Sequence, residues 1–223
     1  MPSTTSHEIV AKPVRIAAGG VRLEGDLTIP PSAGGVVLFA HGSGSSRLSS
    51  RNRFVARELV EGGLATLLID LLTAEEERVD EVTAELRFDI GLLADRLAGA
   101  IDWLRRENTT RGLRVGLFGA STGGGAALVA AARRPDDVAA VVSRGGRPDL
   151  AGDALPLVRA PTLLIVGGND PVVSGLNRQA YAQLRSEKQL VIVPGATHLF
   201  EEPGALEQVA RLARAWFVRH TRA

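Results

Sequence analysis

Cysteine is missing from this 223-residue sequence, and aromatic residues make up only 4% of it. Without cysteine the chain holds no disulfide, no thiolate nucleophile and no metal bound through sulfur. Lysine and arginine total 26 against 25 aspartates and glutamates. The basic residues are spread along the chain without interleaved aromatic residues, so the pattern gives no support for a nucleic-acid partner.

Long apolar stretches are missing as well. No segment approaches the roughly 20 apolar residues of a membrane span, and residues 1–20 hold no apolar run typical of a signal peptide. We therefore expect a cytoplasmic protein that binds no membrane. A chain of 223 residues suits one sizeable core better than two small ones. We predict a single domain over residues 1–223, with residues 1–12 as a loosely ordered N-terminal segment.

Short apolar runs alternate with helical patterns along most of the chain, which predicts an α/β fold with a doubly wound, mostly parallel sheet. The runs 36–39 and 163–166 are continuously apolar, as expected for strands covered on both faces. Residues 14–17 and 22–29 flank a Gly-Gly turn and predict an antiparallel hairpin at the edge. The other expected strands are 65–71, 113–118, 138–143 and 189–193, and the expected helices are 52–61, 88–106, 124–133, 175–185 and 205–220.

Residues 72–87 form the least regular stretch, and they fit either a loop or a short exposed helix. Acidic side chains gather in residues 75–81. We interpret this charge run as a solvated face.

The run Gly119-Ala120-Ser121-Thr122-Gly123 lies between a predicted strand and a predicted helix. In a G-x-S-x-G motif, a sharp strand-to-helix turn lifts the serine oxygen above the sheet edge. Glycine at both ends removes Cβ atoms that would crowd the turn. Ser121 is therefore a candidate nucleophile, and a purely structural turn is the alternative while the motif stands alone.

A serine nucleophile needs a general base, and the chain has four histidines. His7 and His220 lie far from the predicted strand ends, and His41 sits in a loop whose neighbours suggest another role. His198 follows the strand 189–193 through a Pro-Gly turn. Loops after parallel strands emerge at the edge that presents Ser121, so we predict His198 as the base. A surface histidine in a loop is the alternative.

A carboxylate should orient that base, and Asp170 directly follows the strand 162–166. Its loop closely precedes the strand that leads to His198. The chain order Ser121, Asp170, His198 matches one of the known triad orders. An aspartate before proline is also a common turn former. The competing carboxylates are Asp70, Asp149 and Asp153.

Two backbone amides are expected to hold the oxyanion that develops on an attacked carbonyl. One is the amide of Thr122, directly after the nucleophile. The other is the amide of Ser43 in the loop His41-Gly42-Ser43-Gly44, where glycine lets the backbone approach a ligand. A phosphate cradle is the alternative for this loop, but the loop lacks a Walker-type Gly-Lys-Ser/Thr ending.

Taken together, these pieces resemble the α/β-hydrolase superfamily over nearly the whole chain, and most closely its dienelactone-hydrolase-like branch. The matched pieces are the loop 41–44, the G-x-S-x-G motif 119–123, Asp170 in Gly-Gly-Asn-Asp-Pro and His198 in Gly-Ala-Thr-His. The resemblance implies a sheet of about seven to eight strands, a Ser121-Asp170-His198 triad, and neither cofactor nor metal. It further implies hydrolysis of an ester, lactone or thioester of a small substrate through an acyl-enzyme.

One departure from that branch concerns the nucleophile. Dienelactone hydrolase itself uses a cysteine, whereas this chain has Ser121 and no cysteine, which favours ordinary carboxylester chemistry. An acyltransferase or perhydrolase would use the same triad with another acceptor than water. A non-catalytic binding or partner domain of the same fold is the alternative outside enzymes.

The connection 144–161 has only eighteen residues, too few for the helical cap that many relatives insert there, so we predict an open, shallow site. Arg144 and Arg147 stand near the carboxyl edge of the sheet. Two guanidinium groups there could bind a substrate carboxylate in forked geometry. Salt bridging at the surface is the favoured alternative.

Overall fold

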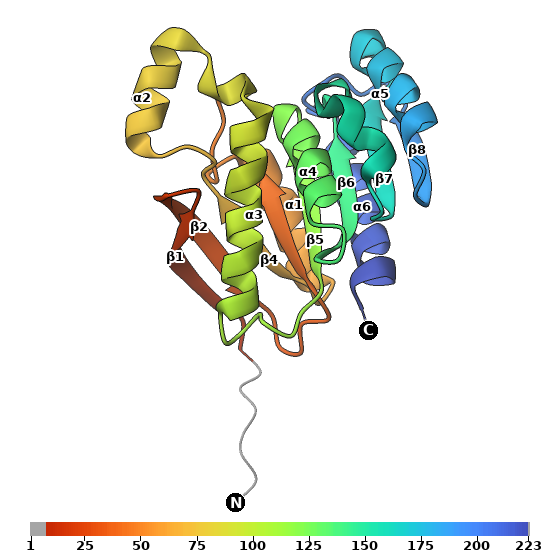
Figure 1. The fold of residues 1–223 in the computed structure, drawn as a ribbon. Helices are drawn as coiled ribbons and strands as arrows, with labels where there is room; N and C mark the ends of the chain where they lie inside the picture. The colour runs from red at the N-terminus through yellow and green to blue at the C-terminus, as the bar shows by residue number, and fades with distance from the viewer. Residues whose placement is uncertain (1–7, 223) are drawn as a thin grey trace, which may run out of the picture.

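An eight-stranded sheet runs through the molecule in the order β1-β2-β4-β3-β5-β6-β7-β8 (Figure 1). The structure is a computed structural model that describes residues 8–222. Strands β3 to β8 are parallel, whereas β1 pairs antiparallel with β2 and β2 antiparallel with β4. The mostly parallel sheet with an N-terminal hairpin is therefore confirmed. The strands are β1 Val10–Ala18, β2 Val21–Ile29, β3 Val36–Ala40, β4 Ala65–Ile69, β5 Val115–Ala120, β6 Val138–Arg144, β7 Thr162–Gly167 and β8 Lys188–Val193.

Helices cover both faces of this sheet (Figure 1). One face carries α1 (Ser50–Glu61) and α6 (Ala205–Thr221), which pack on each other. The opposite face carries α3 (Ile90–Arg106) and α4 (Thr122–Arg133), together with α5 (Pro171–Gln183). The short helices α2 (Ala74–Thr83), η1 (Leu86–Phe88) and η2 (Pro148–Leu157) complete the described elements.

Alternate side chains of the central strands pack into two separate hydrophobic cores, one on each face of the sheet. Leu38 and Leu117 pack under α3 and α4, while Phe39 and Phe118 point to the α1 and α6 side. The rings of Phe39 and Phe118 lie 4.8 Å apart between centroids. Because successive side chains of a strand point to opposite faces, a strand buried on both faces must be apolar at every position. The continuous apolar run of β3 meets that requirement.

The N-terminal hairpin is longer than the sequence pattern indicates. Strand β1 begins at Val10 and pairs with β2 through nine residues on each side. The prediction of a loose segment is therefore wrong for residues 10–12, and residues 1–7 lie outside the described part of the chain. Pairing with β2 orders these residues, although their side chains are largely exposed.

Residues 74–83 form α2, which settles the ambiguity of the acidic stretch in favour of a helix. Thr73 starts it with a capping box: its Oγ1 accepts from the amide of Glu76 at 3.2 Å, and the Glu76 carboxylate accepts from the Thr73 amide at 2.8 Å. Asp80 corrects the prediction of a wholly solvated face. It is only 3% exposed and accepts from the backbone and guanidinium of Arg87.

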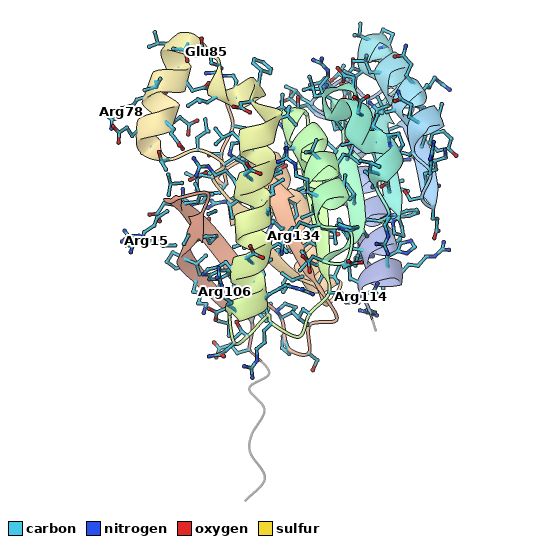
Figure 2. The ribbon with its side chains drawn as sticks, viewed as in Figure 1. Arg15, Arg78, Glu85, Arg106, Arg114 and Arg134 are labelled. Atoms are coloured by element: carbon cyan, nitrogen blue, oxygen red, sulfur yellow. The ribbon has the colours of Figure 1, made fainter. Side chains whose placement is uncertain are left out.

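The connection between β6 and β7 holds η2, which packs against α4 and α5 and forms no separate cap domain. Charged side chains stand around the outside of the molecule, as Arg15, Arg106 and Arg114 do in Figure 2. Within residues 8–222, none of the helices is long and apolar enough to cross a membrane.

Candidate active site

Ser121 sits at the sharp turn between β5 and α4, with φ 51° and ψ −123°. A serine at positive φ costs about 1–3 kcal/mol, so the surroundings must hold it there. The carbonyl oxygen of Ser121 accepts from the amide of Gly124 at 2.9 Å and from the amide of Arg147 at 3.0 Å. These contacts fix the turn that the G-x-S-x-G motif predicts.

Both glycines of the motif are required by crowding. A Cβ atom on Gly119 would lie 2.4 Å from the carbonyl oxygen of Gly123, and one on Gly123 would lie 2.4 Å from the carbonyl oxygen of Ala40. The end of β3, the end of β5 and the start of α4 therefore meet backbone to backbone. This close packing brings Ser121 beside the loop that follows β3.

His198 and Asp170 come together as the sequence predicts. The Nδ1 atom of His198 lies 2.8 Å from Oδ2 of Asp170. A carboxylate only accepts hydrogen bonds, so Nδ1 carries the hydrogen in this contact, which leaves Nε2 as the acceptor nitrogen whenever the ring is neutral. The Asp170 side chain is 14% exposed and that of His198 is 39% exposed. Oδ1 of Asp170 also accepts from the amide of Val173 at 3.3 Å, which caps α5.

The competing carboxylates have other roles. Asp70 accepts from the amide of Arg47 at 2.7 Å and forms an ion pair with its guanidinium. Asp149 accepts two hydrogen bonds from the guanidinium of Arg147. Asp153 is exposed in η2. Asp170 is therefore the carboxylate that contacts the candidate base.

Ser121 and His198 line one cavity of about 180 Å³. It opens at the carboxyl edge of the sheet, where the loop after β3, the start of α1, the end of β6 and the loop after β8 converge. The structure thus brings the predicted nucleophile and the predicted base to one space. The residues lining this cavity are Gly42, Ser43, Ser45, Ser49, Arg51, Asn52, Ala120, Ser121, Arg144, His198 and Leu199.

Ser43 and Thr122, the predicted oxyanion donors, are also neighbours. Their side-chain oxygens lie 3.1 Å apart in a hydrogen bond. Thr122 is the first residue of α4, so its amide has no acceptor within the helix and lies at the positive end of the helix dipole. Gly42 approaches Ser121 so closely that a Cβ atom there would lie 3.0 Å from Cβ of Ser121.

His41 has a role that the sequence did not reveal. Its Nδ1 donates to the carbonyl oxygen of Gly42 at 2.9 Å, and its Nε2 accepts from the amide of Leu71 at 3.0 Å. The ring therefore ties the candidate oxyanion loop to the end of β4. Burial lowers the pKa of His41, while the Gly42 carbonyl and Asp70 act in the opposite direction. The neutral ring suits both bonds, because only a neutral Nε2 accepts.

The two arginines predicted near the edge separate. Arg144 lines the cavity and is 6% exposed. Arg147 instead forms a two-pronged ion pair with Asp149. For Arg147 the salt-bridge alternative therefore describes the geometry. Arg51 and Asn52 also line the cavity, although no sequence motif marked them.

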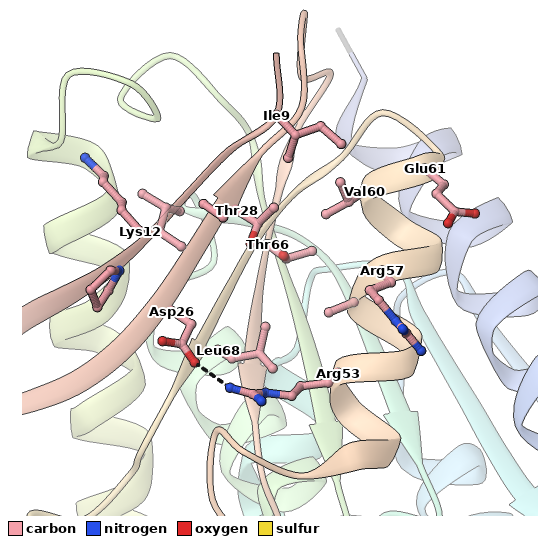
Figure 3. A pocket seen from close by; sticks show the side chains of 14 residues that line it. Ile9, Lys12, Asp26, Thr28, Arg53, Arg57, Val60, Glu61, Thr66 and Leu68 are labelled. Atoms are coloured by element: carbon pink, nitrogen blue, oxygen red, sulfur yellow. Dashed lines mark hydrogen bonds and ion pairs between the residues drawn. The ribbon is translucent and has the colours of Figure 1, made fainter.

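A larger cavity, of about 610 Å³, lies elsewhere, between the N-terminal hairpin and α1 (Figure 3). Asp26 and Arg53 face each other across it at 3.2 Å. Its described lining includes neither serine nor histidine, so its size does not make it the place of serine chemistry.

Comparison with known proteins identifies the family of this chain. A model of the dienelactone hydrolase family matches residues 23–219. The chain belongs to the dienelactone hydrolase family. A crystal structure of a dienelactone hydrolase from Anabaena variabilis shares 63% identity with it, at a TM-score of 0.95, over 97% of this chain and 100% of that one. Est1E from Butyrivibrio proteoclasticus shares the fold at 17% identity, with a TM-score of 0.78 over 93% of this chain and 98% of its own.

Two curated relatives come from strains of Mycobacterium tuberculosis and are provisionally named phosphoribosyl transferases. Each is 60% identical over 207 residues, which cover 93% of this chain. The match covers 46% of each relative, so the chain spans about half the length of these family members.

Proposed function

We propose that this chain is a serine hydrolase that cleaves a carboxylic ester, lactone or thioester of a small substrate through an acyl-enzyme. The observation that carries the proposal is the 2.8 Å contact between His198 and Asp170 beside a cavity that Ser121 also lines. Family membership supports hydrolase chemistry in general. A base held by a carboxylate next to a strained serine is the arrangement that activates a hydroxyl.

In the first half of the reaction, Oγ of Ser121 attacks the carbonyl carbon of the substrate while Nε2 of His198 takes the hydroxyl proton. The carbonyl oxygen becomes an oxyanion that the amides of Ser43 and Thr122 hold. The tetrahedral intermediate then collapses, the bond to the leaving alcohol or thiol breaks, and His198 returns its proton to that group. An acyl ester of Ser121 remains.

Water then repeats the sequence with its own oxygen as nucleophile. His198 takes a proton from the water, a second oxyanion forms at the same amides, and Ser121 leaves with the proton from His198. The carboxylic acid is released and the resting site is restored. Asp170 holds the His198 tautomer throughout and stabilises its charged form.

The name of the two mycobacterial relatives describes a different chemistry. The match to this chain covers 46% of each of those proteins, and this chain itself matches the dienelactone hydrolase family over residues 23–219. We therefore infer hydrolysis for this chain from its own family match and carry no transferase chemistry over from their name.

A panel of substrates tests the proposal. 4-Nitrophenyl acetate, a simple lactone and an acetyl thioester are incubated with the wild type, with Ser121→Ala and with Ser174→Ala as a matched control on α5. We expect at least one substrate to be hydrolysed by the wild type and by Ser174→Ala, with a loss of about a thousandfold or more in Ser121→Ala. Equal rates in Ser121→Ala and the wild type would contradict the proposal.

The acyl acceptor is read from the same reactions. Added methanol or hydrogen peroxide competes with water for the acyl group, and the products are separated as methyl ester, peracid or carboxylic acid. A predominance of carboxylic acid over methyl ester and peracid is expected for a hydrolase. Predominant transfer to methanol or hydrogen peroxide would replace the hydrolase assignment with the acyltransferase or perhydrolase alternative. Failure to turn over any substrate would favour a binding domain.

A further inference from the structure

Among residues 8–222, a buried arginine in the candidate catalytic cavity forms no ion pair with an acidic side chain. Arg144 is 6% exposed, its Nη2 donates to Oδ1 of Asn52 at 3.2 Å, and its guanidinium carbon lies 5.8 Å above the ring of Phe200. Its Nε has no hydrogen-bond partner among residues 8–222. Neither Asn52 nor Phe200 carries a charge, so the cation is not neutralised there. A buried charge without a counter-charge is costly and calls for a partner.

A second guanidinium faces the same cavity. Arg51 lies in the first turn of α1 and lines the cavity with Arg144. Burial is the larger cause and repulsion from Arg51 the smaller cause that lower the pKa of Arg144 to about 10. The Arg144 guanidinium therefore stays charged at neutral pH. Nη1 of Arg51 contacts Glu201 at 3.0 Å, but the Glu201 side chain is 63% exposed. The buried Nε of Arg51 has no partner within the described chain.

The N-terminus of α1 adds donors to the two arginines. Ser49 caps the helix and lines the cavity with Arg51 and Asn52, and the first turn of α1 contains no acidic residue. A helix N-terminus favours anions through its dipole and its free amides. Hydroxyl groups of Ser43 and Ser45 line the same space, whose described lining includes no aspartate or glutamate.

We propose that this cavity binds a phosphate group carried by the substrate, so that the preferred substrate is a phosphate-bearing ester. The inference rests on the proposed hydrolase function and names its substrate class. A phosphate monoester brings a charge of about −1.5 to −2 and three strong acceptor oxygens. Two guanidinium groups, a helix N-terminus and serine hydroxyls match those acceptors better than they match the single charge and two oxygens of a carboxylate.

The size of the cavity fits a compact group. Its volume of about 180 Å³ is below the roughly 300–1,000 Å³ of sites that enclose drug-sized ligands. It accommodates the phosphate and the reacting acyl group, while the rest of a larger substrate lies outside. Arg144 is the last residue of β6 and pairs with Ala120 of β5, the residue before Ser121, so the phosphate would lie beside the carbonyl that Ser121 attacks.

Matched esters test this assignment. Acetate release is measured from 1-acetylglycerol and from 1-acetylglycerol 3-phosphate, which differ only in the phosphate. We expect the wild type to prefer the phosphate ester by about tenfold to a hundredfold in kcat/KM, as charge-assisted hydrogen bonds to an ionised group provide. Arg144→Met and Arg51→Met should each lower that ratio towards one, and Arg144→Lys should restore part of it. Arg57→Met, on the same helix α1 and outside this cavity, is the matched control and should keep the wild-type ratio.

Three results would overturn the assignment. One is an equal rate for the two esters in the wild type. Another is a wild-type ratio that persists in both Arg144→Met and Arg51→Met. The third is a faster reaction with 3-acetoxypropanoate, which carries a carboxylate in place of the phosphate. If Arg144→Met fails to fold, Arg51→Met is used in its place, together with inhibition of 4-nitrophenyl acetate hydrolysis by inorganic phosphate. Inhibition that Arg51→Met weakens supports the assignment, and no inhibition of the wild type overturns it.

The experiments distinguish a failure of the proposed hydrolase function from a failure of the proposed phosphate site. If the neutral esters are hydrolysed through Ser121 without preference for phosphate, the hydrolase stands and the phosphate site falls. If no ester is hydrolysed through Ser121, inorganic phosphate is titrated against the thermal unfolding of Ser121→Ala. A rise in Tm that Arg51→Met abolishes would then support the phosphate site alone, and an unchanged Tm would overturn it.

Discussion

Asp170 has two contacts that a conservative substitution separates. Its Oδ2 meets Nδ1 of His198 and its Oδ1 caps α5 through the amide of Val173. In Asp170→Asn, the amide side chain still caps the helix, because asparagine is as good an N-cap as aspartate. It no longer selects the His198 tautomer whose Nε2 is free. We expect kcat to fall by roughly 10³- to 10⁴-fold, measured by ester hydrolysis.

The thermal midpoint of the same variant is the control. A Tm close to the wild-type value is expected for Asp170→Asn. In Asp170→Ala the cap is lost as well, and the free energy of unfolding should fall by about 0.5–2 kcal/mol. Near-normal turnover by Asp170→Asn would show that another carboxylate orients the base.

His41 makes the stability of the protein dependent on pH. Burial lowers its folded-state pKa below the ordinary value of 6.5, so below that pH the unfolded chain binds a proton that the folded protein resists. Stability from the neutral ring is therefore present above pH 6.5 and is lost as the pH falls through 6.5 towards the folded-state pKa. Urea unfolding between pH 8 and 5 should show a falling midpoint.

His41→Gln isolates this contribution, because glutamine does not titrate and its amide both donates and accepts. Its midpoint should decline less steeply with falling pH than that of the wild type, whatever its absolute stability. His220, whose pKa is also lowered by burial, remains in both proteins and cancels in the comparison. Parallel pH profiles of the two proteins would rule out this role for His41.

The order of strands and loops in the sequence was enough to predict that Asp170 and His198 lie close together. Both residues follow parallel strands, and the loops after such strands share one edge of the sheet. It did not show the contacts of His41, Arg51 and Asn52. Those contacts depend on how the loop after β3 folds against β4 and β6, which no local pattern records. For Arg147 the sequence favoured a surface salt bridge, which the ion pair with Asp149 matches, but it did not name Asp149 as the partner.

At the scale of elements, the elbow between β5 and α4 depends on close backbone packing. A methyl group at Gly123 would lie 2.4 Å from the carbonyl oxygen of Ala40 and 2.5 Å from that of His41. Because these are backbone atoms, either β3 or α4 must shift. We expect Gly123→Ala to lose about 1–3 kcal/mol of stability and most of its ester hydrolysis, as measured by urea unfolding and kcat/KM.

Gly175→Ala provides the matched control within a helix. Gly175 lies in α5, and a Cβ atom there would meet nothing within 4 Å. Alanine should stabilise the protein by about 0.5–1 kcal/mol, since glycine is the weaker helix former, without change in activity. Equal stability of Gly123→Ala and Gly175→Ala would refute the crowding explanation.

Element types were predictable from the alternation of apolar runs and helical patterns, and element ends were less so. The predicted helix 175–185 begins at Pro171, because Asp170 caps it and proline suits the first turn. The predicted strand 65–71 ends at Ile69, because Asp70 turns away to pair with Arg47. Helix α2 owes its start to a capping box inside a run that otherwise looks merely acidic.

At the scale of the whole molecule, one sheet carries every part of the candidate site. Ser43, Ser121, Asp170 and His198 follow β3, β5, β7 and β8 respectively. The relatives from Mycobacterium tuberculosis are about twice as long, and the four candidate residues all lie within the described part of this chain. We therefore expect the chain by itself to react as a serine hydrolase.

Labelling with a fluorescent fluorophosphonate tests this most directly, because the probe phosphonylates a serine only where a base activates it. Wild type, Ser121→Ala and Ser174→Ala are treated in parallel at neutral pH, and the labelled peptide is identified by mass spectrometry. We predict one label on Ser121 in the wild type and in Ser174→Ala, and none in Ser121→Ala. An unlabelled wild-type protein, or undiminished labelling of Ser121→Ala, would contradict the assignment of Ser121 as the nucleophile.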